Sequence, residues 1–373
     1  MTTSTLSLDI LRRYAIRRTL FTAASVPDAI AKIGFVQIDP INAPAPAHDL
    51  ILRHRVPDYK KGDVEQVYPQ SSLEEAFFIN HGYIPRELAT KLWSNKPPSE
   101  YLSSRTAQVA QIKKFAQQNP EIHPKILNQH IGSTTTQNNW SGRGQEGTQI
   151  LQRMHNSGQL RIVRREKGQR VYGLTSDMPR NVAPENIVEA ALHTLAQTYA
   201  PFTHASLIYM MHLLTQSRPD LKPHIQSTLK RAHELLDSAE LDDQRWYWPL
   251  AEQELLAETQ HLPINDTVRL LTPFDPLVWD RTRFKAFWGW TYKLEAYKPA
   301  HQRQLGYYAL PLMWRDECIG WGNLTVVDGA LHAELGYVTQ KPMTKVYQQA
   351  LEKELRRFAN FAHCHTGQQN NLN

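Results

Sequence analysis

The spacing of hydrophobic residues predicts helices along the first two thirds of the chain. Leucine, isoleucine and tyrosine recur every three or four positions between Ser7 and Phe21, and Ser7 can cap the first turn. Similar spacing predicts further helices at residues 27–33, 72–79, 124–131, 148–156, 184–211 and 224–238. Gly158 ends the helix at 148–156, since glycine readily adopts the left-handed conformation that follows many helices.

Alternating hydrophobic and polar residues predict a hairpin in the middle of the chain. Residues 160–165 and 170–174 alternate on either side of a basic turn, 166–169, and a polar loop at 133–147 precedes this region. A helix, a glycine stop, a strand, a basic turn and a strand are typical of a helix-turn-helix followed by a wing. An ordinary edge hairpin is the alternative. The order helix, helix, aromatic strand recurs over 184–248, which suggests diverged copies of one module.

The pattern changes near Leu262 to short alternating runs with regularly spaced turns. These runs suit a small β-barrel or a curved sheet, and an amphipathic helix at 344–362 follows them. We assign most of the aromatic side chains of this region to its core, with a base-stacking platform as the alternative. The predicted strands lie at residues 287–297, 304–314, 318–327 and 330–337.

Composition narrows the class of protein. The chain has 373 residues and two cysteines, too few for a disulfide framework or a four-cysteine iron–sulfur cluster. Residues 363–365 (His-Cys-His) are adjacent and cannot all face one ion on a helix, so we expect no metal site. The sequence lacks an apolar stretch of the roughly 20 residues that a membrane span needs, and residues 1–9 lack the apolar core of a signal peptide. We therefore expect a soluble, cytoplasmic protein.

Basic residues cluster in two places, and the formal net charge is +6. Residues 151–172 contain six arginines and lysines and one glutamate. A second run, Arg281 to Lys293, interleaves basic and aromatic side chains. Such patches favour a polyanionic partner, nucleic acid first, although a solvated face without a partner remains the alternative.

The candidate chemistry lies in the segment Phe35-Val36-Gln37-Ile38-Asp39-Pro40-Ile41. In an extended segment, residues two apart share a face, so Gln37 and Asp39 would lie side by side. A carboxamide and a carboxylate so placed can hold one water molecule and direct it at an electrophile. The alternative is structural: Asp39 pairs with an arginine or caps the turn at Pro40, and Gln37 bonds to backbone.

These residues and several other stretches resemble the winged-helix DNA glycosylases, called AlkZ-like or YcaQ-like proteins. The resemblance spans nearly the whole chain in the right order. The stretches that carry it are Val36–Asn42, Gly82–Arg86, Leu160–Arg165 with Arg170–Tyr172, Leu271–Arg281, Trp288–Trp290 and Leu305–Pro311. The resemblance implies an α+β fold of tandem winged helix-turn-helix motifs followed by a C-terminal β-barrel. We divide the chain accordingly into winged-helix regions at 1–118, 119–180 (with the basic wing) and 181–261, and a barrel-like region with its closing helix at 262–373.

The resemblance also implies a function: excision of alkylated purines from double-stranded DNA and unhooking of interstrand crosslinks. Gln37 and Asp39 fall on the family's two catalytic positions. Members that serve self-resistance in toxin producers carry glutamine at both, so Asp39 places this chain nearer the YcaQ-like branch. No lysine lies beside the pair in sequence, so we expect a monofunctional enzyme that leaves an abasic site. We also expect that the enzyme needs no cofactor and acts as a monomer.

Basic residues of the hairpin and of the segment after the catalytic pair are our candidates for DNA contact. Two non-catalytic functions compete with the enzyme: a winged-helix DNA-binding regulator, and an interaction protein that uses the aromatic C-terminal region. His48 could instead be an ordinary surface or loop histidine. The candidate DNA contacts are Arg164, Arg165, Lys167, Arg170, Arg55, His54 and His48.

Overall fold

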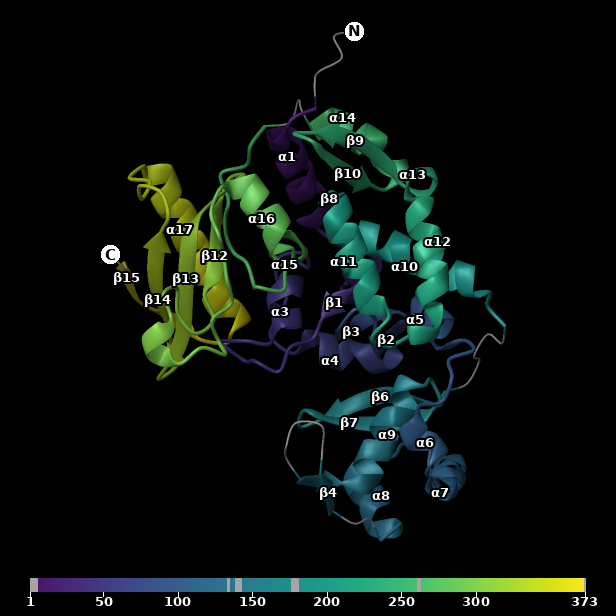
Figure 1. Cartoon of the computed structure of the whole chain (residues 1–373). Helices are drawn as coiled ribbons and strands as arrows, with labels where there is room; N and C mark the ends of the chain where they lie inside the picture. The colour runs from purple at the N-terminus through teal and green to yellow at the C-terminus, as the bar shows by residue number, and fades with distance from the viewer. Residues whose placement is uncertain (1–5, 133–134, 138–142, 176–180, 260–262, 372–373) are drawn as a thin grey trace. The chain divides into compact units, whose positions relative to one another are not determined.

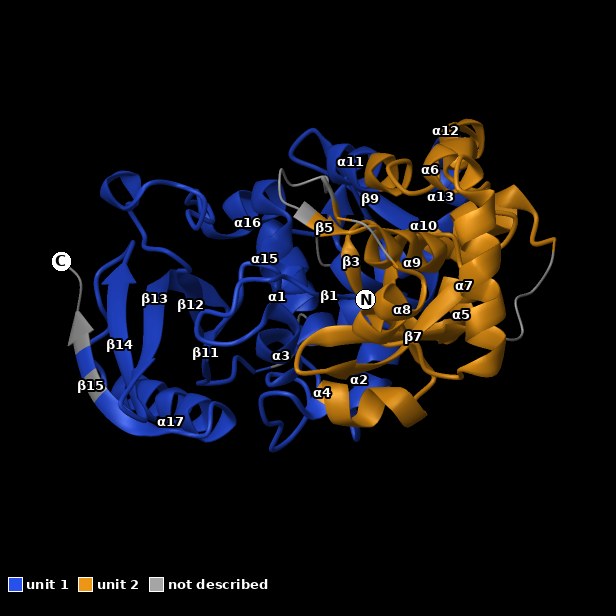
Figure 2. Ribbon diagram, turned by 90° about the horizontal axis from the view of Figure 1, so that it is seen from below, with its two compact units in different colours: residues 1–63, 192–210, 229–373 blue, residues 64–191, 211–228 orange. Residues whose placement is uncertain are grey.

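The computed structural model describes residues 6–132, 135–137, 143–175, 181–259 and 263–371, and Figure 1 labels their helices and strands. The fold mixes α and β elements. The chain forms two compact units, each assembled from separated segments (Figure 2). Unit 1 comprises Met1–Asp63, Leu192–Met210 and Leu229–Asn373, and unit 2 comprises Val64–Ala191 and Met211–Thr228. Among the described residues, no helix is long and apolar enough to cross a membrane.

Unit 1 is built around the N-terminal helix and a C-terminal sheet. Helix α1 (Leu8–Thr19) packs against α14, α15 and α16, and the Ser7 side chain caps it, as predicted. The other elements of this unit outside the C-terminal sheet are α2 (Val26–Ile33), β1 (Val36–Gln37), α3 (Ala47–Leu52), β8 (Phe202–Thr203), α13 (Ala232–Leu235), β9 (Asp237–Leu241), β10 (Gln244–Trp248), α14 (Gln253–Thr259), α15 (Pro276–Trp279) and α16 (Arg281–Trp288).

The C-terminal sheet is a curled, open half-barrel rather than a closed barrel. Its five strands run in the order β11-β12-β13-β14-β15, with β15 parallel to β14 and the other pairs antiparallel. Helix α17 (Lys345–Phe361) packs on β11, β14 and β15, which confirms the predicted closing helix. The strands are β11 (Val268–Leu270), β12 (Leu310–Trp314), β13 (Glu317–Val327), β14 (Ala330–Tyr337) and β15 (His365–Asn371).

The described residues of unit 2 form three antiparallel strand pairs, β2–β3, β4–β5 and β6–β7, with helices around them. The predicted basic hairpin is confirmed as β6 and β7, and helix α9 precedes it, ending just before Gly158 with a φ of +76°. The elements of this unit are α4 (Asp63–Val67), β2 (Leu73–Phe77), β3 (His81–Pro85), α5 (Arg86–Trp93), α6 (Glu100–Ser103), α7 (Thr106–Gln118), α8 (Pro124–His130), β4 (Thr135–Gln137), β5 (Arg143–Gln145), α9 (Glu146–Asn156), β6 (Leu160–Glu166) and β7 (Gln169–Leu174).

Besides α4, whose first residue Asp63 belongs to unit 1, three helices contain residues of both units: α10 (Pro184–Tyr199), α11 (His204–Leu214) and α12 (Lys222–Lys230). They correspond to the helices predicted at 184–211 and 224–238, although β8 interrupts the first after Tyr199 and the end of the second belongs to strand β9. Strand β10 pairs with β8 on one side and with β9 on the other. The predicted aromatic strand near Trp248 is therefore the centre of a small antiparallel sheet.

Two predicted elements were wrong. Residues 72–79 contain strand β2 and no helix, and β2 pairs with β3. Residues 287–297 begin with the end of α16 and contain no strand. The polar loop predicted at 133–147 lies partly outside the described residues, and its described parts form the paired strands β4 and β5.

Candidate active site

The predicted catalytic segment starts where helix α2 ends, in the interior of unit 1. Gly34 ends the helix with a φ of +92°, and a Cβ there would lie 3.0 Å from the Thr194 side chain. The hydroxyl of Thr198 donates a hydrogen bond to the carbonyl of Ile33 at 2.8 Å. Glycine is therefore required by conformation and by the close approach of α10. This junction fixes the direction in which β1 leaves the helix.

Gln37 is 3% exposed, and a tryptophan from a distant part of the chain holds its side chain. The indole Nε1 of Trp279 donates a hydrogen bond to Gln37 Oε1 at 3.2 Å. An indole N–H can only donate, so the atom that faces it must be the carboxamide oxygen. The Nε2 group of Gln37 is then the one left to donate hydrogen bonds to another molecule. The Trp279 ring packs on Tyr199, with ring centroids 4.8 Å apart.

Asp39 follows the end of β1, in a turn, and is half-buried. Its Oδ1 accepts a hydrogen bond from the backbone N–H of Ile41 at 2.9 Å, so the turn-capping role weighed from the sequence is present. The alternative ion pair is not: among the described residues, no basic group lies within 4.0 Å of this carboxylate. Burial raises the pKa of Asp39, and the Ile41 hydrogen bond offsets the shift only in part. A raised pKa makes the carboxylate a stronger base.

Two tyrosines from the segment before β12 lie within reach of the Asp39 charge. Burial and this negative charge both raise the pKa of Tyr297 and of Tyr308. The Tyr308 hydroxyl shares a hydrogen bond with Thr272 Oγ1 at 3.0 Å and is fixed, whereas Tyr297 is 80% exposed. Neither tyrosine is predicted as a site residue from the sequence, although Tyr308 lies in a stretch that carries the family resemblance.

The candidates that follow the catalytic pair expose no donor groups. The side chain of Arg55 is fully buried, and its guanidinium donates hydrogen bonds to both oxygens of Asp275, at 2.8 and 3.1 Å. His54 Nε2 donates to the carbonyl of Leu270 at 3.0 Å, and burial together with the nearby Arg53 charge lowers its pKa well below the usual value. His48 is only 6% exposed, within α3. A phosphate contact needs an exposed donor, which these three side chains do not offer.

Two arginines of the basic hairpin in unit 2 also have an internal partner. Arg165 and Arg170 both bind the carboxylate of Glu75, at 2.6 and 2.8 Å. Burial alone would raise the pKa of Glu75, but the hydrogen bond from His81 and the two arginine charges hold it well below its usual range. These two arginines join the hairpin to β2 and so have a structural role, and their role as phosphate contacts stays a prediction.

The outer part of this hairpin remains available to a polyanion. Lys167 is exposed in the turn with a φ of +48°. Arg164 is exposed over 35% of its side chain, although it pairs with Glu121 and Glu166, each at 2.9 Å. The basic surface of the hairpin is thus smaller than the sequence count indicates. In the described part of the chain, no group of three histidine, cysteine, aspartate or glutamate side chains could hold a metal ion.

The aromatic residues of the second basic run belong mainly to the core of unit 1. Phe284 and Phe287 are buried, and Trp290 donates its indole N–H to the carbonyl of Cys318 at 2.9 Å. Arg283 is also buried and binds backbone carbonyls, including that of Pro201 at 3.3 Å. This run is therefore a structural cluster, as expected for most of its aromatic residues.

Comparisons with known proteins agree with one another. A model of the family "DNA glycosylase AlkZ-like" matches residues 30–361. The structure of the DNA glycosylase AlkZ from Streptomyces sahachiroi has the same fold, with a TM-score of 0.60 over 99% of this chain and 100% of that chain, at 14% sequence identity. Because the family match covers most of the sequence, the chain belongs to the AlkZ-like DNA glycosylases, enzymes that hydrolyse N-glycosyl bonds.

Proposed function

We propose that this DNA glycosylase releases purines alkylated at N7, guanine first, with Asp39 as the general base. The observation that carries the proposal is a half-buried carboxylate whose pKa is raised by burial, close in sequence to a carboxamide whose orientation is fixed. Alkylation at N7 gives the base a positive charge and weakens its bond to the sugar. Such a leaving group needs no general acid, so one base and one held water suffice.

The proposed reaction is a hydrolysis at C1′. The bond between C1′ and N9 breaks, and its electron pair neutralises the charged purine. The negative charge of Asp39 stabilises the developing sugar cation, which is commonly the largest contribution to catalysis of this kind. Asp39 then accepts a proton from the water molecule while the oxygen of that water forms the new bond to C1′. Gln37 donates from Nε2 to that water, since its oxygen is held by Trp279. The products are the free base and an abasic site.

We infer that the exposed ring of Tyr297 contacts the substrate base beside Asp39. Tyr297 is 80% exposed. Tyr308, whose pKa is also raised by the Asp39 charge, is instead buried and hydrogen-bonded. An exposed aromatic ring offers a stacking surface to a purine. The Asp39 charge acts on Tyr297, so the ring would hold a positively charged purine through its face near the proposed general base.

We propose that the chain contains three winged helix-turn-helix regions, within 1–118, 119–180 and 181–261, before the half-barrel at 262–373. The element order supports this division. In the third region, α10, β8, α11 and α12 precede the β9–β10 hairpin, and β8 pairs with β10. In the second, Ile122 pairs with Tyr172 of β7 in the place of a short first strand, ahead of α8 and α9. A wing that follows a recognition helix is typical of this motif.

Lys167 and Arg164 are the DNA contacts that we retain from the sequence, because both keep exposed cationic atoms on the hairpin. Crosslink unhooking is a further proposal, and it rests on the family resemblance. The Gln-x-Asp pattern at the catalytic positions favours a broad alkylpurine substrate range over a dedicated self-resistance role. Family membership disfavours the non-catalytic regulator that the sequence alone left open.

Base release from duplex DNA with a single N7-methylguanine tests the proposal directly. Under single-turnover conditions, we expect Asp39→Asn to release the base roughly a hundredfold or more slowly than wild type, because general-base catalysis alone contributes about 10²–10⁴. Asp63→Asn is a matched control: Asp63 is also half-buried and also accepts a backbone N–H, from Lys60 at 2.7 Å. Equal rates for wild type and Asp39→Asn would place the catalytic base elsewhere. A crosslinked duplex in the same assay tests the wider substrate range.

A further inference from the structure

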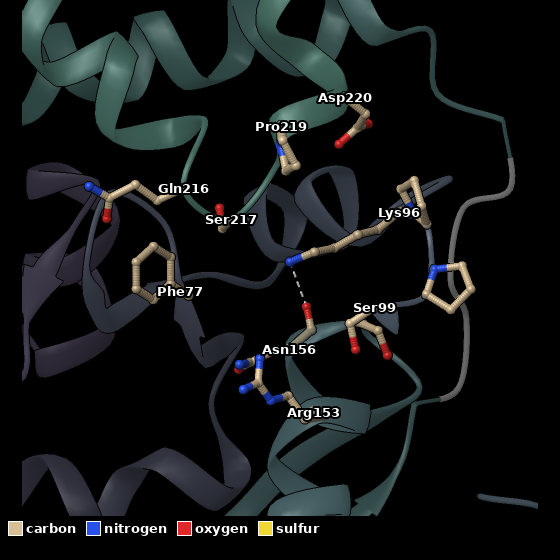
Figure 3. A pocket seen from close by; sticks show the side chains of 12 residues that line it. Phe77, Lys96, Ser99, Arg153, Asn156, Gln216, Ser217, Pro219 and Asp220 are labelled. Carbon is tan, nitrogen blue, oxygen red and sulfur yellow. Dashed lines mark hydrogen bonds between the residues drawn. The ribbon is translucent and has the colours of Figure 1, made fainter. Parts of the chain in front are cut away.

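Unit 2 contains a cavity that the glycosylase reaction does not use (Figure 3). Its volume is about 380 Å³, within the usual range for small-molecule sites. Four parts of unit 2 line it: the end of β2, the turn between α5 and α6, the last turn of α9, and residues 216–220 after α11. These segments are far apart in sequence, so the fold rather than a local turn creates the cavity.

Lys96 lies at the centre of this cavity, and its ammonium group has few local partners. Its Nζ donates one hydrogen bond, to the carbonyl of Asn156 at 2.7 Å (Figure 3). Burial and the positive charge of Arg218 lower the pKa of Lys96 to about 8, although Asp220 opposes the shift. Arg218 holds Asp220 in a short ion pair at 2.7 Å, which offsets much of that carboxylate's charge. An ammonium group has three donors, so two can serve a bound anion.

A second cation and an apolar wall complete the cavity. Arg153 lines it on the α9 side, with its guanidinium 5.5 Å from the ring of Tyr101. Phe77, Pro98 and Pro219 supply flat apolar surface. Cationic groups beside an aromatic and proline surface match a ligand that has an anionic end and a planar ring.

Buried polar atoms nearby also lack partners. Among the described residues, Ser99 Oγ, in the cavity lining, has no hydrogen-bond partner. A second hollow of about 540 Å³ shares Lys96, Pro98 and Ser157 with the first and includes Lys113. Gln159 lines this second hollow, and its buried Oε1 has no partner in the described part of the chain. Buried polar groups are normally paired, so these atoms point to a ligand.

We propose that this cavity binds a nucleotide, with its phosphate on Lys96 and Arg153 and its ring against Phe77 and the prolines. Phosphate esters are the anions that a DNA glycosylase meets most. The nucleotide can belong to a DNA strand or be a free mononucleotide. The second hollow, with Lys113, extends the site by room for a neighbouring nucleotide. The proposal goes beyond the excision reaction and does not depend on its mechanism.

Adenosine 5′-monophosphate, titrated calorimetrically into the full chain, is the probe. Its phosphate is largely dianionic above pH 7, so the pH dependence of binding reports on the protein. With Lys96 titrating at about pH 8, we expect an affinity about tenfold weaker at pH 9 than at pH 7, with proton uptake on binding near pH 8. Adenosine, which lacks the phosphate, should bind weakly and without this pH dependence.

Lys96→Met keeps most of the length of the side chain and removes its charge, and we expect it to weaken binding at pH 7 at least tenfold. Lys91→Met is the matched control, since Lys91 lies on α5 and pairs with Glu87 at 2.7 Å. If Lys96→Met fails to fold, the pH dependence of wild type still decides the matter. Three results would overturn the proposal. They are a dissociation constant of wild type above about 10 mM, the same dissociation constant at both pH values, or a folded Lys96→Met variant that binds the probe as tightly as wild type.

The two sources of the nucleotide are separated by competition. A short single-stranded oligonucleotide that displaces adenosine 5′-monophosphate assigns the site to a nucleotide of a DNA strand. An oligonucleotide that leaves the bound probe in place assigns it to a free nucleotide. Base release from methylated duplex is measured alongside, so that a failure of the excision proposal is recognised separately from a failure of this one.

Discussion

Replacing Trp279 with phenylalanine removes the indole N–H that fixes Gln37 while keeping an aromatic ring against Tyr199. The hydrogen bond joins Trp279 Nε1 to Gln37 Oε1 over 3.2 Å, and Gln37 is 3% exposed. Without it, the carboxamide can rotate and present its oxygen to the water in place of its N–H groups. We expect slower base release with little change in DNA binding.

The size of this effect follows from ordinary hydrogen-bond energies. A neutral hydrogen bond contributes about 0.5–1.5 kcal/mol net, and a buried acceptor left unpaired costs about 1–3 kcal/mol. Only the share of this energy that orients the water adds to the activation free energy of base release. We assign about 0.7–1.4 kcal/mol to that share, which corresponds to a rate roughly 3- to 10-fold lower. The effect of Asp39→Asn should be larger, because it removes the proton acceptor itself.

Single-turnover release of N7-methylguanine measures the loss, and a double-mutant cycle with Gln37→Leu identifies its route. If Trp279 acts through Gln37, the double variant should be no slower than Gln37→Leu alone. Trp290→Phe is the matched control, because it also deletes an indole hydrogen bond, to the carbonyl of Cys318 at 2.9 Å, away from the carboxamide. Additive effects of the two substitutions, or equal losses in Trp279→Phe and Trp290→Phe, would refute the reasoning.

Four further outcomes follow from the structure. Because burial raises the pKa of Asp39, the rate of base release should begin to fall at a higher pH than it would with an ordinary aspartate of pKa about 3.9. The same burial disfavours the charged carboxylate, so Asp39→Asn should have a higher melting temperature than wild type at pH 7. Tyr297→Ala should weaken engagement of the methylated base while Tyr297→Phe retains it, as KM-type saturation curves would show; equal behaviour of the two would exclude a stacking role. Arg55→Leu leaves Asp275 buried without its ion pair and should cost about 3–5 kcal/mol in urea unfolding. Lys167→Ala should reduce the slope of the logarithm of the DNA-binding constant against the logarithm of salt concentration by about one phosphate contact. An unchanged slope would show that Lys167 does not contact a phosphate.

The sequence was sufficient where local signals agreed with the final environment. Ser7, the spacing of α1 and the Gly158 stop predicted their elements well. It failed at β2, whose two adjacent glutamates resemble an exposed helical face. In the structure Glu74 and Glu75 are each 1% exposed and bind arginines more than 80 positions along the chain. No local pattern reveals that a carboxylate will be buried by a distant partner.

The same limit applies to the candidate site. Gln37 and Asp39 could be singled out from their spacing, but the groups that give them their properties come from far along the chain. Trp279 lies 242 positions from Gln37. Helix α16 was missed although the sequence contains both residues that mark its ends. These are Asp280, which caps its first turn, and Gly289, which follows it with a φ of +75°. The aromatic alternation over 287–297 predicts a strand there instead.

The buried pair between Arg53, which follows α3, and Glu354 of α17 has a consequence for biogenesis. Arg53 stands only 14 positions after Asp39, yet its partner is 301 residues further along the chain. During synthesis on the ribosome, the pair between Arg53 and Glu354 cannot form until α17 has emerged. A nascent or prematurely terminated chain that lacks α17 would leave the Arg53 guanidinium without Glu354 and without the Phe358 ring that covers it. Base-excising activity should therefore be acquired late in translation.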